Sequence, residues 1–152
     1  MIKQFIAVAA LATLVTGCAS VPMGNTTQDT QLKSFPEPDA GNAGIYVYRN
    51  SVMGSGLKKD LWIDDQCLGE SASGIYFYKQ VLGNQNHKVS TESEFSPNDL
   101  MVTTEAGKNY FIRQYIKPGM FVGGANLELM SEQEGEKAVA KLKLAESGHC
   151  SK

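Results

Sequence analysis

Apolar and polar residues alternate through most of the chain from Gly44 to Met130, and this period of two restricts the fold most strongly. Successive side chains of a β-strand point to opposite faces, so alternation gathers the apolar residues on one face. β-Branched and aromatic residues are frequent in these runs, and Gly, Asn, Asp and Pro separate them. The pattern predicts strands near Gly44–Arg49, Asp60–Asp64, Cys67–Glu70, Ile75–Gln80, His87–Glu94, Leu100–Glu105, Tyr110–Ile116 and Phe121–Met130.

These strands follow one another with no helical segment between them, which favours an antiparallel β-sandwich of the immunoglobulin-like kind over an α/β sheet. After the last strand, Ser131 and Glu134 have the spacing of a capping box. Ala138 and Leu142 follow at helical intervals. We therefore predict one short C-terminal α-helix, although Gly135 in its first turn costs about 1 kcal/mol relative to Ala.

Residues 1–17 have the features of a bacterial lipoprotein signal peptide. Lys3 precedes an apolar run from Phe5 to Val15, and this run is too short for the roughly twenty residues that cross a bilayer. It leads through two small residues into Cys18, an arrangement that resembles a lipobox. The resemblance implies cleavage before Cys18, diacylglycerol on its sulfur and an acyl chain such as palmitate on its amine. The alternative is an ordinary secretory signal followed by an incidental cysteine.

Three acyl chains on Cys18 would hold the protein permanently at a membrane, because two already suffice for stable anchoring. Ala19 stands where an aspartate would favour retention in the inner membrane. We therefore expect the protein at the periplasmic face of the outer membrane.

The residues after Cys18 are rich in Thr, Gln, Asn, Asp, Gly and Pro and contain few apolar residues to bury. Such a composition predicts disorder. We expect residues 18–43 to form the lipidated cysteine and a disordered tether, and residues 44–152 to form a single β-sandwich domain, which is an ordinary size for one core.

The charge of the chain excludes some classes of partner. Removing the leader removes Lys3 and changes the formal net charge from −2 to about −3. The longest basic block is Lys58-Lys59. We therefore expect neither nucleic-acid binding nor polybasic recognition of lipids.

Two segments of the chain nearly repeat each other: Gly-Ile-Tyr-Val-Tyr-Arg from Gly44 and Gly-Ile-Tyr-Phe-Tyr-Lys from Gly74. In each, alternation places the two tyrosines on the face opposite the aliphatic residues. One interpretation is half-buried packing with the hydroxyls at the surface, and the other is a face that binds a glycan or a protein. The possible binding face consists of Tyr46, Tyr48, Tyr76 and Tyr78.

Four segments together resemble one bacterial family. They are Gly44–Asn50, Leu61–Glu70, Ser90–Asp99 and Glu105–Tyr115. They are similar to the lipoprotein domain catalogued as domain of unknown function 2846, and the resemblance extends from Gly44 to about Leu144. It implies a small envelope β-domain, distantly similar to transthyretin-like sandwiches. It implies no catalytic residue, because the family has no established activity to transfer.

The residues themselves also give little support for catalysis. A nucleophile needs a base and an orienting group, and the imidazole bases are His87 and His149, both in polar stretches. Glu92 and Glu94 could serve a glycosidase or hold a cation. We favour the interpretation that both are solvated charges beside a turn. We expect no catalytic residue, no metal site and no cofactor.

Three cysteines are encoded, and lipidation would use Cys18. Cys67 and Cys150 then remain in an oxidising compartment, where we expect them to form a disulfide. Two free thiols or an intermolecular bridge are the alternatives.

Taken together, the sequence predicts a lipid-anchored envelope protein with a non-catalytic binding or structural role. Its expected partners are the membrane, through Cys18, and an envelope protein or a glycan. The alternatives are a carbohydrate- or peptidoglycan-binding module and, more distantly, a hydrolase.

Overall fold

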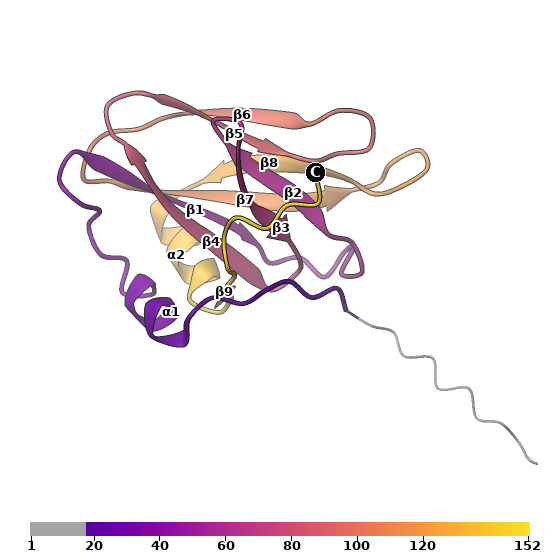
Figure 1. The fold of residues 1–152 in the computed structure, drawn as a ribbon, viewed down its shortest axis with the longest axis horizontal. Helices are drawn as coiled ribbons and strands as arrows, with labels where there is room; N and C mark the ends of the chain where they lie inside the picture. The colour runs from indigo at the N-terminus through magenta and orange to yellow at the C-terminus, as the bar shows by residue number, and fades with distance from the viewer. Residues whose placement is uncertain (1–17) are drawn as a thin grey trace, which may run out of the picture.

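A computed structural model describes residues 18–152, so the predicted signal peptide lies outside the described residues. These residues form two sheets and two helices, arranged as Figure 1 shows. One sheet contains β1 (Asn42–Arg49), β4 (Ile75–Leu82), β7 (Asn109–Lys117), β8 (Gly124–Met130) and β9 (Lys143–Leu144). The other contains β2 (Lys59–Ile63), β3 (Gln66–Ser71), β5 (Asn86–Thr91) and β6 (Asn98–Thr103). The helices are α1 (Thr26–Leu32) and α2 (Glu132–Val139).

The prediction of a mainly β chain with a short C-terminal helix is confirmed, but the strands are not all antiparallel. The strand orders are β8-β7-β1-β4-β9 and β3-β2-β5-β6. In the larger sheet, β1 pairs in parallel with β7, and β4 pairs in parallel with β9. Parallel neighbours need a long connection. Between β1 and β7 that connection contains β4 and the whole smaller sheet, which strand spacing alone did not reveal.

The two sheets share one hydrophobic core. Alternate residues of β1, Ile45 and Val47, point into it and are fully buried. Leu61 and Ile63 of β2 and Leu68 of β3 enter the same core from the smaller sheet. The period of two in the sequence therefore identifies the inward faces of β1 and β2 correctly.

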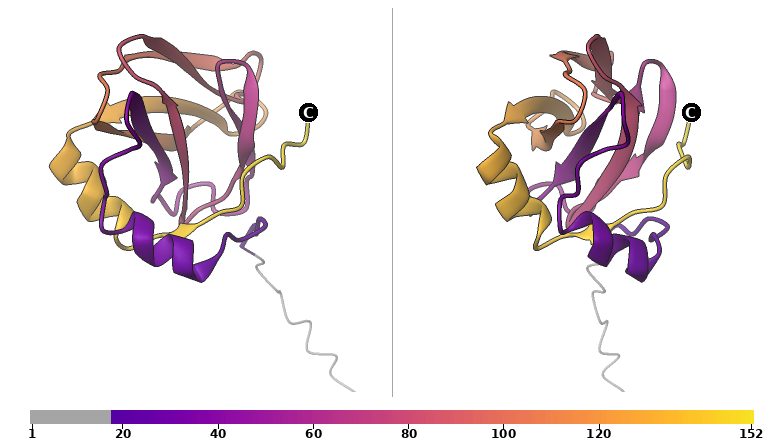
Figure 2. Two further views of the ribbon diagram at one scale, coloured as in Figure 1. Left: turned by 60° about the vertical axis from the view of Figure 1, so that its left-hand side comes forward. Right: turned by 90° about the vertical axis from the view of Figure 1, so that its left-hand side faces the viewer.

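A second hydrophobic cluster covers the other face of the larger sheet. It joins aromatic residues of β1, β4 and β7 to Leu32 of α1, Val139 of α2 and Leu142 just beyond it. Figure 2 shows both helices on the same side of this sheet. The larger sheet is therefore buried on both faces.

The segment 18–43 is not a disordered tether, because the folded domain holds it along its length. Asn25 caps α1 by accepting a hydrogen bond from the Thr27 amide at 2.8 Å. The Gly24 amide donates to the Leu144 carbonyl at 2.9 Å, and Leu32 is buried. Apolar side chains such as Leu32 and Phe35, together with hydrogen bonds to distant parts of the chain, thus order a segment whose composition is typical of disorder.

The last long strand, β8, begins at Gly124. Alternation predicted that it would begin at Phe121. Met120, Phe121 and Val122 lie in the exposed loop between β7 and β8. Their amides donate to the Glu94 carboxylate, at 2.7 Å from Met120 and 3.2 Å from Val122. The Glu94 carboxylate therefore binds backbone amides that would pair with a neighbouring strand if this segment belonged to β8.

Ser131 caps α2 as its spacing to Glu134 predicted, but the Glu134 side chain binds the Ser131 hydroxyl in place of the backbone amide that a full capping box uses. The Ser131 hydroxyl accepts a hydrogen bond from the Glu134 amide at 3.4 Å, and its Oγ also lies 2.6 Å from Glu134 Oε2. Gly135 allows the helix to approach β7 closely, since a Cβ there would lie 2.2 Å from the Cβ of Phe111. The glycine that weakens the helix locally is therefore required by its packing.

We expect Gly135→Ala to destabilise the protein even though alanine favours helix. The methyl group would overpack the contact with Phe111, and we expect a net loss of about 1–2 kcal/mol in the free energy of unfolding. Urea denaturation measures this loss. Gln133→Ala, at an exposed position of the same helix, is the control and should stay within about 0.5 kcal/mol of the parent. A stabilised Gly135→Ala protein would contradict the packing argument.

Candidate functional site

The four tyrosines of the predicted binding face lie side by side, because the two similar segments are neighbouring strands. The antiparallel register of β1 and β4 places Tyr46 opposite Tyr78 and Tyr48 opposite Tyr76. Tyr46 and Tyr76 are completely buried. The Tyr46 ring stacks on Phe111 with 4.9 Å between centroids. The prediction that these rings form an exposed binding face is therefore wrong.

Helix α1 accepts hydrogen bonds from the hydroxyls of Tyr46 and Tyr76. The Tyr46 hydroxyl donates to the Leu32 carbonyl at 3.1 Å, and the Tyr76 hydroxyl donates to Asp29 Oδ1 at 2.7 Å. Burial raises the pKa of both tyrosines. Although burial opposes it, hydrogen bonds from Tyr76 and Lys33 lower the pKa of Asp29. These groups hold α1 in place and leave no room for a ligand between the rings.

Tyr48 differs, because it lines an open pocket of about 410 Å³. Its side chain is only 2% exposed, and no described residue forms a hydrogen bond with its hydroxyl. Burial raises the pKa of Tyr48; the charge of Arg113 acts to lower this pKa, and the charge of Glu134 acts to raise it. A phenol at the wall of a pocket can donate a hydrogen bond to a ligand that accepts one. We call this cavity the Tyr48 pocket.

Positive charge predominates around the Tyr48 pocket. The parallel register of β1 and β7 places Arg113 next to Tyr48, and Lys137 and Lys141 come from α2 and the turn after it. In the described part of the chain, neither lysine forms an ion pair. Arg113 reaches Glu128 only at 3.8 Å, and its Nε is buried without a partner. Together with Glu134 and apolar walls, these cations could hold an organic anion.

The groups considered for catalysis have structural partners. His87 places Nδ1 2.6 Å from Asp64 and Nε2 2.7 Å from the Leu82 carbonyl, so both ring nitrogens face protein oxygens. Glu92 binds Lys152 at 2.9 Å, whereas Glu94 binds the β7–β8 loop. Within residues 18–152, no cluster of three or more His, Cys, Asp or Glu side chains is arranged to hold a metal ion.

The predicted disulfide between Cys67 and Cys150 is present and fastens the C-terminal tail to β3. Just before Cys150, the tail forms backbone hydrogen bonds with the edge of the smaller sheet. The Gly148 amide donates to the Leu68 carbonyl at 2.9 Å, and the Glu70 amide donates to the His149 carbonyl at 2.7 Å. The tail therefore lies against the free edge of β3.

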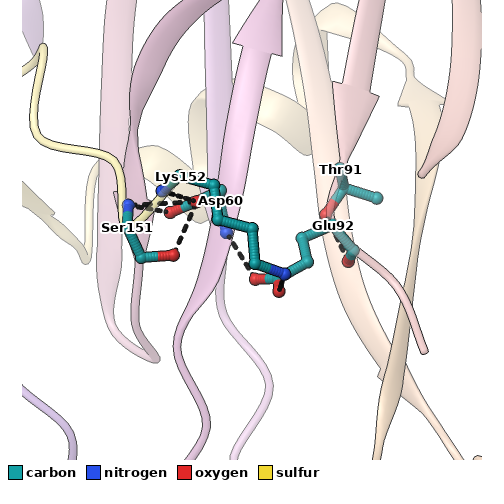
Figure 3. Close-up of polar contacts among 5 residues, drawn as sticks. All are labelled: Asp60, Thr91, Glu92, Ser151 and Lys152. Atoms are coloured by element: carbon teal, nitrogen blue, oxygen red, sulfur yellow. Dashed lines mark hydrogen bonds and ion pairs between the residues drawn. The ribbon is translucent and has the colours of Figure 1, made fainter. Parts of the chain in front are cut away.

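Beyond the disulfide, Asp60 binds the last two residues (Figure 3). Its buried carboxylate accepts hydrogen bonds from the Ser151 amide at 2.9 Å, the Ser151 hydroxyl at 2.7 Å and the Lys152 amide at 3.1 Å. Lys152 Nζ then reaches Glu92 at 2.9 Å. Sequence reasoning missed Asp60, because only the folded chain brings its carboxylate to a tail about ninety residues away.

Cys18, the predicted lipidation site, is exposed and begins the described chain. The next residue is already bound to the domain, because the Ala19 amide donates to the Ser55 carbonyl at 3.1 Å. Cys18 is thus placed beside the loop between β1 and β2. No helix among residues 18–152 has the length and apolarity needed to span a membrane.

We expect Cys67→Ser to lower the stability of a soluble protein that begins at residue 19. The disulfide closes a loop with a sequence separation of 83 residues. In the chain-entropy model this closure contributes about 4–5 kcal/mol. Thermal unfolding should show a clear fall in Tm, and the denatured, unreduced parent should give no thiol signal. Cys67→Ser/Cys150→Ser should match the single variant, and two reactive thiols in the parent would refute the bond.

Comparisons with known proteins agree with the resemblance read from the residues. The chain is 53% identical over 149 residues to an uncharacterized protein of Haemophilus influenzae, covering 96% of this chain and 88% of that relative. No solved structure matches. A family model described as "Protein of unknown function (DUF2846)" matches residues 39–125, which is more than half of the chain. The chain therefore belongs to the DUF2846 family.

Proposed function

We propose that the protein is a lipid-anchored envelope protein with a non-catalytic binding or structural role at the periplasmic face of the outer membrane. The observation that carries the proposal is the position of Cys18. This residue is exposed, follows a lipobox-like sequence and adjoins a residue already bound to the domain. Acyl chains on its sulfur and amine would therefore hold the folded domain directly against a bilayer.

Two further features support this proposal. A disulfide suits an oxidising compartment such as the periplasm. Both sheets also contribute to one core, and we propose a sandwich related to the transthyretin-like or immunoglobulin-like type, modified by its two parallel strand pairs. Such a domain offers a rigid scaffold for a binding role.

Cys18→Ser should abolish palmitate incorporation in a Gram-negative host and leave the unprocessed precursor, because the maturation peptidase acts on the lipidated form. Labelling with radioactive palmitate and fractionation of the membranes measure both effects. Cys150→Ser is the control, because it removes a cysteine that the proposal does not lipidate, and it should keep the label. Undiminished labelling of Cys18→Ser would end the proposal.

A peptidoglycan-binding role is the second candidate, and the Tyr48 pocket favours it. With Tyr46 and Tyr76 buried, sugars have no exposed tyrosine layer on which to stack. The pocket instead offers Arg113, Lys137 and Lys141 to a carboxylate, and the unpartnered Tyr48 hydroxyl to an acceptor oxygen. Peptidoglycan stems present carboxylates beside apolar methyl groups, which fit this combination of cations and apolar walls.

Isolated peptidoglycan sacculi should retain the soluble protein in a pull-down at low salt. Lys137→Glu/Lys141→Glu should reduce the retained fraction by about tenfold or more, because each lost charge-assisted hydrogen bond is worth about 1.5–3 kcal/mol. Lys108→Glu, which alters a lysine of the turn before β7, is the matched control and should bind normally. Equal retention of both proteins would exclude the Tyr48 pocket as a peptidoglycan site.

A further inference from the structure

Six large apolar side chains are exposed on three loops of the protein. They are Val52, Met53, Phe95, Met120, Phe121 and Val122, and we call this set the apolar tip. Val52 is 86% exposed, Phe121 81% and Phe95 75%. Scattered exposed apolar residues are ordinary, but a contiguous group of them marks an interaction surface.

The three loops belong to one end of the molecule, at the right in Figure 1. The rings of Phe95 and Phe121 meet edge to face with 6.5 Å between centroids. Gly54, in the loop between β1 and β2, and Gly123, in the loop between β7 and β8, both approach the side chain of Ile116. Phe95 and Phe121 therefore lie together, and the loop that carries Val52 and Met53 meets the β7–β8 loop at Ile116.

Polar contacts hold the β1–β2 and β7–β8 loops in shape. Arg49 is fully buried at the end of β1, and it donates to the carbonyl of Leu57 at 2.7 Å and to that of Gly54. Glu94 accepts three amides of the β7–β8 loop, and these hydrogen bonds lower its pKa. The exposed side chains are thus displayed by fixed backbones, which lowers the entropic cost of binding.

The apolar tip lies next to the point where the lipid would be attached. The Ala19 amide binds the Ser55 carbonyl, in the same loop that carries Val52 and Met53. An acyl group on Cys18 would therefore enter a bilayer beside these side chains. Lys117, at the end of β7, lies close to the tip and suits the phosphate of a lipid headgroup.

We propose that the apolar tip inserts into the boundary between headgroups and acyl chains of the membrane that holds Cys18. This inference rests on the proposed lipid anchoring and adds to it a contact that fixes the orientation of the domain. Interfacial proteins bury apolar side chains in this boundary to a depth of about 5–10 Å. The lipid then brings the tip to the surface, and the tip prevents the domain from rotating about its anchor.

Fluorescence quenching in vesicles tests the insertion. The lipidated full-length mature protein is reconstituted into phosphatidylethanolamine and phosphatidylglycerol vesicles whose acyl chains carry bromine. Trp62→Phe provides a background without tryptophan, since the chain contains one. Phe121→Trp probes the tip in this background. Leu82→Trp is the matched control, because Leu82 is an exposed residue at the end of β4 and pairs with Asn42 at the start of β1, whereas the tip follows the end of β1.

We expect bromine to remove about half or more of the emission of the Phe121→Trp protein and about a tenth or less of that of the control, given the shallow depth of interfacial insertion. Circular dichroism verifies that both variants fold, and mass spectrometry verifies the acyl groups. Equal quenching of the two acylated variants would overturn the insertion of the tip and would leave the proposed anchoring through Cys18 in place. Quenching that depends on protein density would assign the tip to a second copy of the chain and likewise overturn it. Absence of acyl groups on Cys18 would overturn the anchoring and this inference with it.

Discussion

The pairing of β1 with β4 is the interaction on which the outer half of the molecule depends. Its register sets Tyr46 opposite Tyr78 and Tyr48 opposite Tyr76, on the face away from the core between the sheets. A layer of four such rings would be a large apolar patch in water. The chain therefore supplies a cover from both of its ends, with α1 before β1 and α2 after β8. Once covered, the Tyr46 and Tyr76 hydroxyls require partners, and α1 provides them.

Local patterns in the sequence predict those features whose physical cause is local. Alternation locates Ile45 and Val47 on the inner face of β1, and the spacing of Ser131 and Glu134 locates the start of α2. Counting cysteines pairs Cys67 with Cys150, although this rested on assigning Cys18 to a lipid. The lipidation itself remains a prediction.

Features that depend on distant partners could not be predicted in this way. Composition made the segment around Leu32 look disordered, because its order comes from contacts with the tyrosine layer. The Tyr48 pocket could not be predicted from the sequence for a related reason. Tyr48 and Arg113 become neighbours only through the parallel pairing of β1 and β7, and Lys137 joins them from a helix packed on that sheet. Gly135 could be recognised only as a poor helix former until the contact with Phe111 was known.

The attachment of the C-terminal tail to β3 also bears on how the protein stays soluble. β3 is an edge strand, and its free backbone groups would otherwise offer a template to another chain. The tail occupies that edge through Gly148 and His149, and the disulfide keeps it there. If the protein is exported as proposed, this edge stays uncovered until residue 150 has crossed the membrane and can form the disulfide. Oxidation of Cys67 and Cys150 would then help to close the smaller sheet to self-association.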